Sequence, residues 1–168
     1  MRNFYSRLNF LSLCFFASLV LLAGCSSSKS KVGGMLNLDT DLRHKFIADE
    51  TINPDDNKRP SPVFVRLYEL KSPTKFTKAD FIDLYERDEE VLGDDMVGKQ
   101  VLKPLAPGEE RAERMVLQSG TRYVAIYAEF SQYRGAVYKV VFPVTENNIF
   151  KNKALVELSG TKISLDKK

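Results

Sequence analysis

The sequence predicts a mainly β protein, a two-sheet antiparallel β-sandwich with a small two-helix insertion between the second and third strands. Short runs rich in β-branched and aromatic residues follow one another along the chain, and polar turns separate them. In several of these runs apolar and polar residues alternate, which is the period of a strand with one buried face. One stretch in the first half instead repeats its apolar residues at spacings of three and four, which is the period of a helix. Short strands interrupted by one helical stretch are typical of a sandwich that carries an insertion.

The N-terminal segment has the features of a lipoprotein signal peptide. Arg2 and Arg7 provide a positive start, Phe10 to Ala23 is an almost unbroken apolar run, and the sequence LLAGC ends at Cys25. The apolar run is too short to span a bilayer comfortably. Small residues before the cysteine let a signal peptidase reach the bond, and the thiol of Cys25 then accepts a diacylglyceryl group. The alternatives are an ordinary signal peptide or an uncleaved anchor, with Cys25 as an incidental thiol.

These features divide the chain into three regions. We expect residues 1–24 to be removed as a signal peptide, residues 25–34 to form a lipidated flexible tether, and residues 35–168 to form the sandwich domain with its helical insertion at about 74–95. Two or three acyl chains on one cysteine anchor a protein permanently to a membrane. Ser26, rather than an aspartate, follows the cysteine. This favours the periplasmic face of the outer membrane over retention in the inner membrane.

Composition excludes several classes of function. Without residues 1–24 the chain has 144 residues and a formal charge near +1, because the charge of +3 for all 168 residues includes Arg2 and Arg7. Acidic and basic residues are interspersed, so no nucleic-acid-binding surface is indicated. The single histidine, His44, falls in a predicted loop and cannot support a metal cluster or a Ser/His/Asp triad. We therefore expect no enzyme activity, no metal, no small-molecule substrate and no cofactor other than the covalent lipid on Cys25.

The first half of the domain contains two predicted strands and a long loop. Leu36 and Leu38 alternate with polar residues in a first strand from Val32 to Asp39, and the run PVFVRLYEL from Pro62 to Leu70 is the second strand. The segment between them, Thr40 to Ser61, is polar and rich in turn-forming residues, and it shows neither a helical nor a strand period. A loop of about twenty residues inside a compact domain is unusual, and such loops are commonly functional.

A helical pair follows the second strand. Thr77 and Asp80 fit a capping box at the start of a helix that runs from Lys78 to about Arg87. A second helical turn is expected to begin at Asp88, and Gly93 is a suitable stop. The β-like runs beyond it are residues 97–105, 112–118, 122–130, 136–144, 155–158 and 162–165.

Two groups of charged residues could suggest a ligand site, but structural roles explain them better. Arg66 alternates with apolar residues of the second strand, and we expect it to lie along the outer sheet face or to pair with an acid such as Glu69 or Asp83. The acidic run from Asp88 to Glu90 does not have the spacing of a calcium loop. Complementation of the helix dipole and exposure to solvent account for this run.

Four stretches of the chain resemble one known family. They are RPSPVFVRLYELKS at residues 59–72, FTKADFIDLYERDEEVLGDDM at 76–96, LAPG at 105–108 and YVAIYA at 123–128. This combination is similar to the TssJ family, also called SciN, of outer-membrane lipoproteins in the type VI secretion system. The chain departs from the family in one respect, because residues 132–137 lack the tryptophan common there and the sequence contains none.

The resemblance implies a transthyretin-like β-sandwich and a role without catalysis. Proteins of this family tether the trans-envelope complex to the outer membrane by binding the periplasmic C-terminal domain of TssM, the large inner-membrane component. The loop between the first two strands takes part in that contact. In this sequence that loop is the segment from Thr40 to Ser61.

The predicted loop supplies the candidate binding residues. We expect exposed apolar side chains to give contact and charged side chains to set orientation, through Phe46, Ile47, Asp49, Glu50, Ile52, Asn53 and Pro54. The alternative is a solvated connector whose apolar residues fold back on the sandwich. A second possible function is a periplasmic lipoprotein that binds a small ligand or a carbohydrate on the same sandwich. A deep pocket with convergent polar groups would favour that second function.

Overall fold

The computed structural model describes residues 40–145 and 152–166, which belong to one compact unit beginning at residue 37. Several sequence predictions lie outside these residues. They are the signal peptide, the lipidation site Cys25, the tether and the first strand predicted from Val32 to Asp39.

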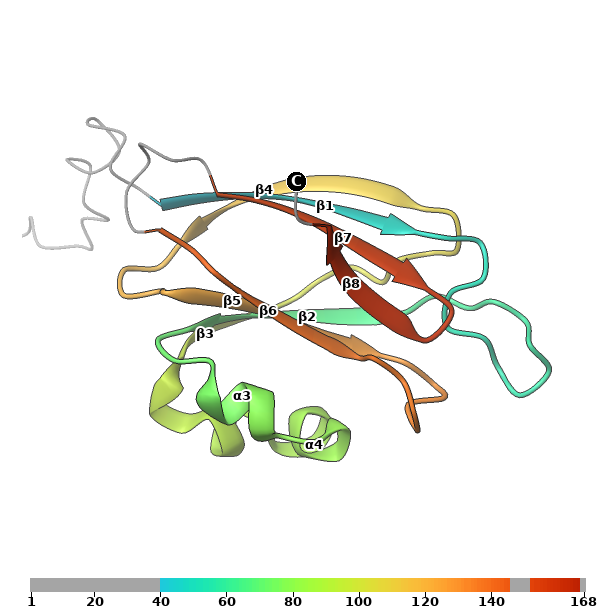
Figure 1. The fold of residues 1–168 in the computed structure, drawn as a ribbon, viewed down its shortest axis with the longest axis horizontal. Helices are drawn as coiled ribbons and strands as arrows, with labels where there is room; N and C mark the ends of the chain where they lie inside the picture. Colours follow the sequence, from blue (N-terminus) through green and yellow to red (C-terminus); the bar gives the residue numbers. More distant parts are fainter. Residues whose placement is uncertain (1–39, 146–151, 167–168) are drawn as a thin grey trace, which may run out of the picture. The chain divides into compact units, whose positions relative to one another are not determined.

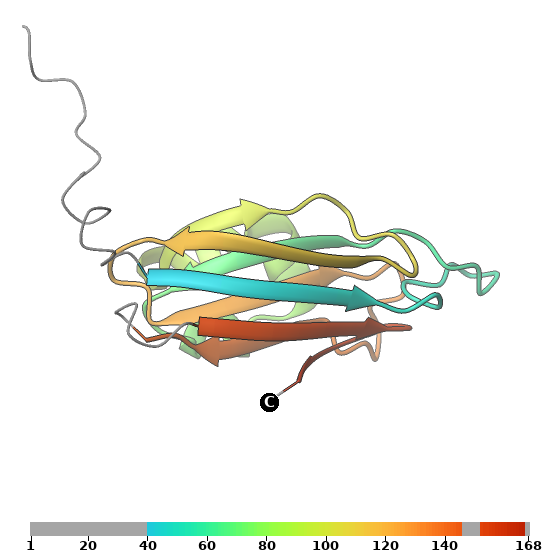
Figure 2. The ribbon, with the colours of Figure 1, turned by 90° about the horizontal axis from the view of Figure 1, so that it is seen from above.

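The described residues form two four-stranded sheets that pack face to face, with two helices against the outer face of one sheet (Figure 1). One sheet has the order β4-β1-β7-β8, and Figure 2 shows it from above with β1 between β4 and β7. The other has the order β3-β2-β5-β6. The strands are β1 Thr40–Ala48, β2 Phe64–Leu70, β3 Met96–Val101, β4 Glu110–Leu117, β5 Tyr123–Glu129, β6 Lys139–Pro143, β7 Asn152–Ser159 and β8 Lys162–Asp166.

This architecture confirms the predicted fold class. Among the named strands of the described chain, the pairings are antiparallel except that of β1 with β7, which is parallel. The two sheets also meet at one side, where Val137 forms an isolated parallel bridge with Lys162 at the start of β8. The strands β4 and β3 are edges of their sheets at the other side.

The interior between the sheets is built from alternating side chains. Val65 and Leu67 of β2 point into the same apolar cluster as Ile126 of β5, Val156 of β7 and Phe46 of β1, and each of these side chains is fully buried. Complete burial of one such side chain stabilises the fold by about 1.5–3 kcal/mol. This cluster is the core that holds both sheets together.

Strand β1 corrects the prediction of a long loop. Residues Thr40–Ala48, predicted as part of that loop, form the strand at the centre of the β4-β1-β7-β8 sheet. Leu42, Phe46 and Ala48 do alternate along it, but the buried residue between them is His44, a polar side chain that hides the strand period. The segment between the first two strands is therefore residues 49–63, about two thirds of the predicted length.

The helical insertion lies between β2 and β3, as predicted, and consists of α3 Thr74–Lys78, α4 Phe81–Leu92 and the short 3-10 helix η2 Gly93–Asp95. The predicted capping box at Thr77 is wrong. Thr77 lies inside α3, where its hydroxyl donates to the carbonyl oxygen of Pro73 at 2.8 Å. The capping box instead begins at Asp80, three residues later. The carboxylate of Asp80 accepts from the backbone N–H of Asp83 at 2.8 Å, and the carboxylate of Asp83 accepts from the backbone N–H of Asp80.

The predicted interruption and stop of α4 are both present. Arg87 has non-helical angles, φ −144° and ψ 38°, so a new helical segment starts at Asp88. Gly93 ends it with φ +48°, a backbone conformation that suits glycine. The helices pack on the sheet through a second apolar cluster, in which Phe81 contacts the rings of Tyr127 and Tyr138 at centroid distances of 5.3 and 5.2 Å.

Candidate functional site

Four connecting segments gather at the end of the sandwich where β1 finishes. We call the segments 49–63, 102–109, 130–138 and 160–161 the loop end. Backbone hydrogen bonds join them: Ala48 N–H donates to Glu109 at 2.9 Å, and Asn53 N–H donates to Gly160 at 2.8 Å. In Figure 1 the segment 49–63 projects beyond the strands at this end. The loop end is therefore a continuous surface built from both sheets.

Asn53 holds the first of these segments in place. Its side-chain amide donates to Ser61 Oγ at 3.0 Å and to the carbonyl oxygen of Pro62 at 2.8 Å, and its Oδ1 accepts from the backbone N–H of Ser131 at 2.7 Å. The residue is buried and has φ +48°, a left-handed conformation that asparagine tolerates better than most residues. Asn53 thus clamps the base of the segment to the neighbouring loop rather than facing a partner.

Asp55 orders the tip of the segment. Its carboxylate accepts from the backbone N–H of Asn57 at 2.8 Å and from the backbone N–H of Arg59 at 2.9 Å, and it pairs with the Arg59 guanidinium at 2.8 Å. The hydrogen bonds from Arg59 hold the pKa of Asp55 below its ordinary value, so the carboxylate stays ionised at neutral pH. The tip is a preformed turn, and an ordered surface loses less entropy on binding than a floppy one.

The structure divides the predicted binding residues into two groups. The side chains of Phe46 and Ile52 are fully buried in the core, so the prediction that these two residues are exposed is wrong. Asn53 is buried as well. Phe46 lies on the buried face of β1, and Ile52 packs into the same apolar cluster between the sheets. Surface remains at the other four predicted residues, of which Glu50 is exposed and Ile47, Asp49 and Pro54 are partly exposed.

Asp49 lies at the junction of three loop-end segments. Its carboxylate accepts from the backbone N–H and the hydroxyl of Thr51, both at 2.8 Å, and its carbonyl oxygen accepts from the N–H of Gly108 at 3.1 Å. Burial raises the pKa of Asp49, but hydrogen bonds from Ser159 and Thr51 outweigh it and hold the pKa below its ordinary value. Residues 56–60 complete the exposed surface. The candidate binding residues chosen from the sequence did not include residues 56–60, although the run NPDDNKRP predicts a turn.

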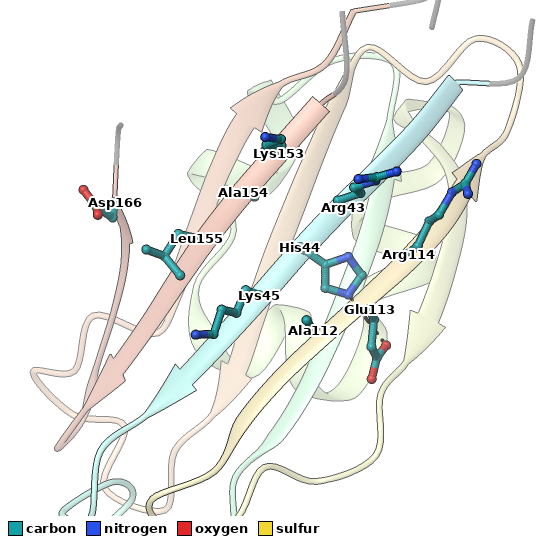
Figure 3. Close-up of a pocket in the computed structure, with 10 residues that line it drawn as sticks. All are labelled: Arg43, His44, Lys45, Ala112, Glu113, Arg114, Lys153, Ala154, Leu155 and Asp166. Carbon is teal, nitrogen blue, oxygen red and sulfur yellow. Dashed lines mark ion pairs between the residues drawn. The ribbon is translucent and has the colours of Figure 1, made fainter.

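A groove of about 760 Å³ lies over the β4-β1-β7-β8 sheet. Its cations are Arg43, Lys45, Arg114 and Lys153. Figure 3 shows their side chains standing side by side along three strands, with Asp166 of β8 at the margin. The volume is within the range of small-ligand sites, but the polar groups do not converge on one point. This arrangement does not favour the ligand-binding alternative.

The sequence predicted His44 in a loop, and this prediction is wrong. His44 lies on β1, with its side chain buried inside the sandwich. Its ring is 3% exposed and packs edge-on against Phe46, with ring centroids 5.3 Å apart. Nε2 lies 3.6 Å from the carboxylate of Glu113, too far for a hydrogen bond. Burial lowers the pKa of His44, and the nearby Glu113 only partly offsets this. The imidazole is therefore neutral at pH 7 and acts as a core side chain.

Arg66 ties the helices to the sheet, with partners that the sequence did not predict. Its guanidinium pairs with Glu129 at 2.6 Å and with Asp88 at 3.2 Å, and it donates to the carbonyl oxygen of Leu84 at 2.9 Å. The predicted partner Glu69 instead accepts from Thr121 and from the backbone of Gln118. Asp88 is buried, so the interpretation of the acidic run as a solvated helix start is wrong for its first residue.

Residues 40–145 and 152–166 contain neither a metal-binding cluster nor a helix able to cross a membrane. No group of three His, Cys, Asp or Glu side chains there could hold a metal ion. None of the helices in this part of the chain is both long and apolar enough to cross a membrane.

Comparison with known proteins identifies the family. Residues 40–161 match the family described as type VI secretion lipoprotein, VasD, EvfM, TssJ. The chain belongs to this family. It is similar to the type VI secretion lipoprotein TssJ1 of Pseudomonas aeruginosa, with 26% sequence identity and a TM-score of 0.68 over 77% of this chain and 97% of that chain. A comparison with curated protein sequences gave no significant match.

Two further solved structures contain chains similar to this member of the TssJ family. One, named "Type VI membrane complex", has a chain with 27% identity and a TM-score of 0.68 over 77% of this chain and 99% of that chain. The other, named "T6SS protein TssM C-terminal domain (869-1107) from EAEC", gives 25% identity and a TM-score of 0.63 over 76% of this chain and 98% of that chain. The family match begins at the first residue of β1 and ends in the turn after β7, so it includes every segment of the loop end.

Proposed function

We propose that this protein is a lipid-anchored scaffold of the type VI secretion membrane complex that docks the periplasmic C-terminal domain of TssM at its loop end. Membership in the type VI secretion lipoprotein family supports the system to which it belongs. A chain with this fold occurs in a structure named for the TssM C-terminal domain, which supports the partner. The role is mechanical, and it needs neither a catalytic residue nor a cofactor besides the lipid on Cys25.

The course of β1 is the observation that carries the proposal. In the sequence, Cys25 precedes Thr40, where β1 begins, and β1 reaches the loop end at Ala48. Nine residues at about 3.3 Å each make a strand of about 30 Å. Because β1 is hydrogen-bonded on both sides, it is a stiff connection between the lipidated segment and the loop end. A pull applied at the loop end is transmitted through this strand.

The surface that we assign to TssM differs from the surface predicted from sequence. Ile47, Asp49, Glu50 and Pro54, with the tip at residues 55–60, provide the contact. The buried residues Phe46, Ile52 and Asn53 hold this surface in shape from beneath. We place the lipid on Cys25 in the periplasmic leaflet of the outer membrane, because Ser26 follows the cysteine.

A binding titration tests the proposal. The mature lipoprotein, solubilised in detergent, is titrated with the periplasmic C-terminal domain of TssM from the same organism. We expect micromolar or tighter binding that weakens about tenfold in a double variant Glu50→Lys, Lys58→Glu, because both side chains are exposed on the loop end. Val116→Glu, on the edge strand β4 near the beginning of β1, is the control. Absence of binding by the wild-type protein would overturn the proposed function.

A further inference from the structure

Exposed apolar side chains concentrate in one groove on the helix side of the molecule. Six large hydrophobic side chains are exposed in the described part of the chain, and three of them line a groove of about 690 Å³. They are Phe64 of β2, Tyr85 of α4 and Val101 of β3, with exposed fractions of 51%, 49% and 61%. Scattered single apolar residues on a surface need no explanation, but a cluster in a hollow marks an interaction site.

The groove exists because the helices cover only part of the β3-β2-β5-β6 sheet. Along β2, Phe64, Arg66 and Tyr68 share the face toward the helices, and Tyr68 is fully buried there while Phe64 is half exposed. Val101 pairs with Arg66 across the β2–β3 ladder and therefore belongs to the same face. Phe64 and Val101 thus form an uncovered apolar strip beside α4.

The charges of the groove favour a basic occupant. In its floor, Arg66 is neutralised by Glu129 and Asp88, and Lys99 pairs with Asp88 at 3.1 Å. The rim is formed by α4, whose Glu86 is exposed and has no ion pair among the described residues. The lining residues comprise five carboxylates and three cations, namely Glu86, Asp88, Glu89, Glu90 and Glu129 against Arg66, Arg87 and Lys99. The net charge of the lining is negative.

The groove opens onto the loop end. Phe64 is the first residue after segment 49–63, Val101 is the last before segment 102–109, and Glu129 is the last before segment 130–138. A partner seated on the loop end is therefore within reach of the groove without any change in the sandwich.

We propose that this groove is a second docking site, which takes an apolar side chain flanked by lysine or arginine from the same partner that binds the loop end. The inference rests on the proposed function for the identity of that partner. The apolar side chain contacts Phe64, Tyr85 and Val101, and the flanking cations lie against the glutamates of α4. Apolar contacts in such a hollow supply most of the binding energy, and the charged rim sets orientation and the rate of association.

A pair of matched variants tests the groove. Val101→Glu introduces a charge into the groove, and Val116→Glu introduces the same charge on the other sheet, at a valine with 56% exposure on an edge strand. Both variants are titrated, as the mature lipoprotein in detergent, against the periplasmic C-terminal domain of TssM. We expect Val101→Glu and Phe64→Ala each to weaken binding by about tenfold, and Val116→Glu to leave it unchanged.

Folding and partner identity are checked separately. Thermal unfolding of Val101→Glu should match that of Val116→Glu, since both side chains are exposed. If wild-type protein binds TssM and all three variants bind equally well, the groove is not a docking site and the proposed function survives. If wild-type protein does not bind, the proposed function fails and the groove loses its partner. An equal loss in both glutamate variants also overturns the inference, because it reflects an effect of charge that is independent of the groove.

Discussion

The hydroxyl of Tyr68 on β2 donates a hydrogen bond of 2.7 Å to the carboxylate of Asp88 on α4, so one buried acid joins the helical insertion to the sheet. The same carboxylate accepts from Lys99 on β3 at 3.1 Å and from Arg66 at 3.2 Å. Burial by itself raises the pKa of Asp88, but hydrogen bonds from Tyr68 and Lys99 outweigh it and keep the pKa below its ordinary value. Asp88 is therefore ionised in the folded protein at neutral pH.

Replacing Asp88 should loosen the helices. Asp88→Ala leaves the hydroxyl of Tyr68 without its acceptor and leaves Lys99 with Glu89 as its remaining carboxylate, and removing one partner of a buried ion pair costs about 3–5 kcal/mol. We expect a loss of about 3 kcal/mol in the free energy of unfolding, because Arg66 keeps its contact with Glu129. Urea unfolding followed by circular dichroism measures it. Glu90→Ala on the same helix, at an exposed side chain, is the control and should change little. Equal stability of the two variants would contradict the structural role of Asp88.

The single histidine should make the fold sensitive to acid. Burial lowers the pKa of His44 below the ordinary histidine value of about 6.5, which the residue keeps in the unfolded chain. The unfolded state therefore binds a proton first as the pH falls below about 6.5, and the free energy of unfolding decreases from that point down to the folded pKa. One proton gives a slope of at most about 1.4 kcal/mol per pH unit.

The groups that face His44 set the size of this effect. Glu113 favours the protonated ring, and Arg111, which lies 3.6 Å from the same carboxylate, opposes it. Urea unfolding at pH 7.5 and pH 5.5 should show a larger loss of stability for the wild-type protein than for His44→Leu. Equal losses in both proteins would mean that other groups cause the acid sensitivity.

The sequence predicted strands and helix ends correctly where neighbouring residues alone determine them. Val65 and Leu67 alternate with polar or aromatic residues in the predicted second strand, and both are buried on one face of β2; Gly93 ends the helix as predicted. The helix start predicted at Lys78 lies three residues before the observed start of α4 at Phe81. The sequence did not distinguish the two, because Thr77 and Asp80 are each followed three positions later by an aspartate. Only the contact of Thr77 with Pro73, inside a preceding helix, decides between them.

Strand β1 could not be recognised from its own residues. Its inward series contains His44, and its position between β4 and β7 depends on pairing with residues about 70 and 110 positions further along the chain. For the same reason Phe46 was taken as an exposed anchor. The predicted binding site therefore included both surface and core residues. The strands that pair with β1 and bury Phe46 lie far from it in the sequence.

Two neighbouring residues of β1 should therefore respond differently to truncation. Phe46→Ala removes a fully buried ring and should lower the free energy of unfolding by about 3–5 kcal/mol. Ile47→Ala, on the opposite face and partly exposed, should lower it by less than about 1 kcal/mol. Chemical denaturation of both variants measures this difference. If Phe46→Ala were as stable as the wild-type protein, the position of β1 in the core would be wrong.

The proposed lipid on Cys25 can be tested separately from the sandwich. Cys25→Ser removes the acceptor of the diacylglyceryl group, so we expect the protein to leave the membrane fraction and type VI secretion to be lost. The first described strand of the sandwich begins at Thr40, beyond the substitution, and the thermal stability of the sandwich should not change. Fractionation of cells, metabolic labelling with a fatty acid and a secretion assay measure the three effects. A variant that is unlabelled yet supports secretion at the wild-type level would show that the anchor is dispensable, because the loop end alone would then hold the complex.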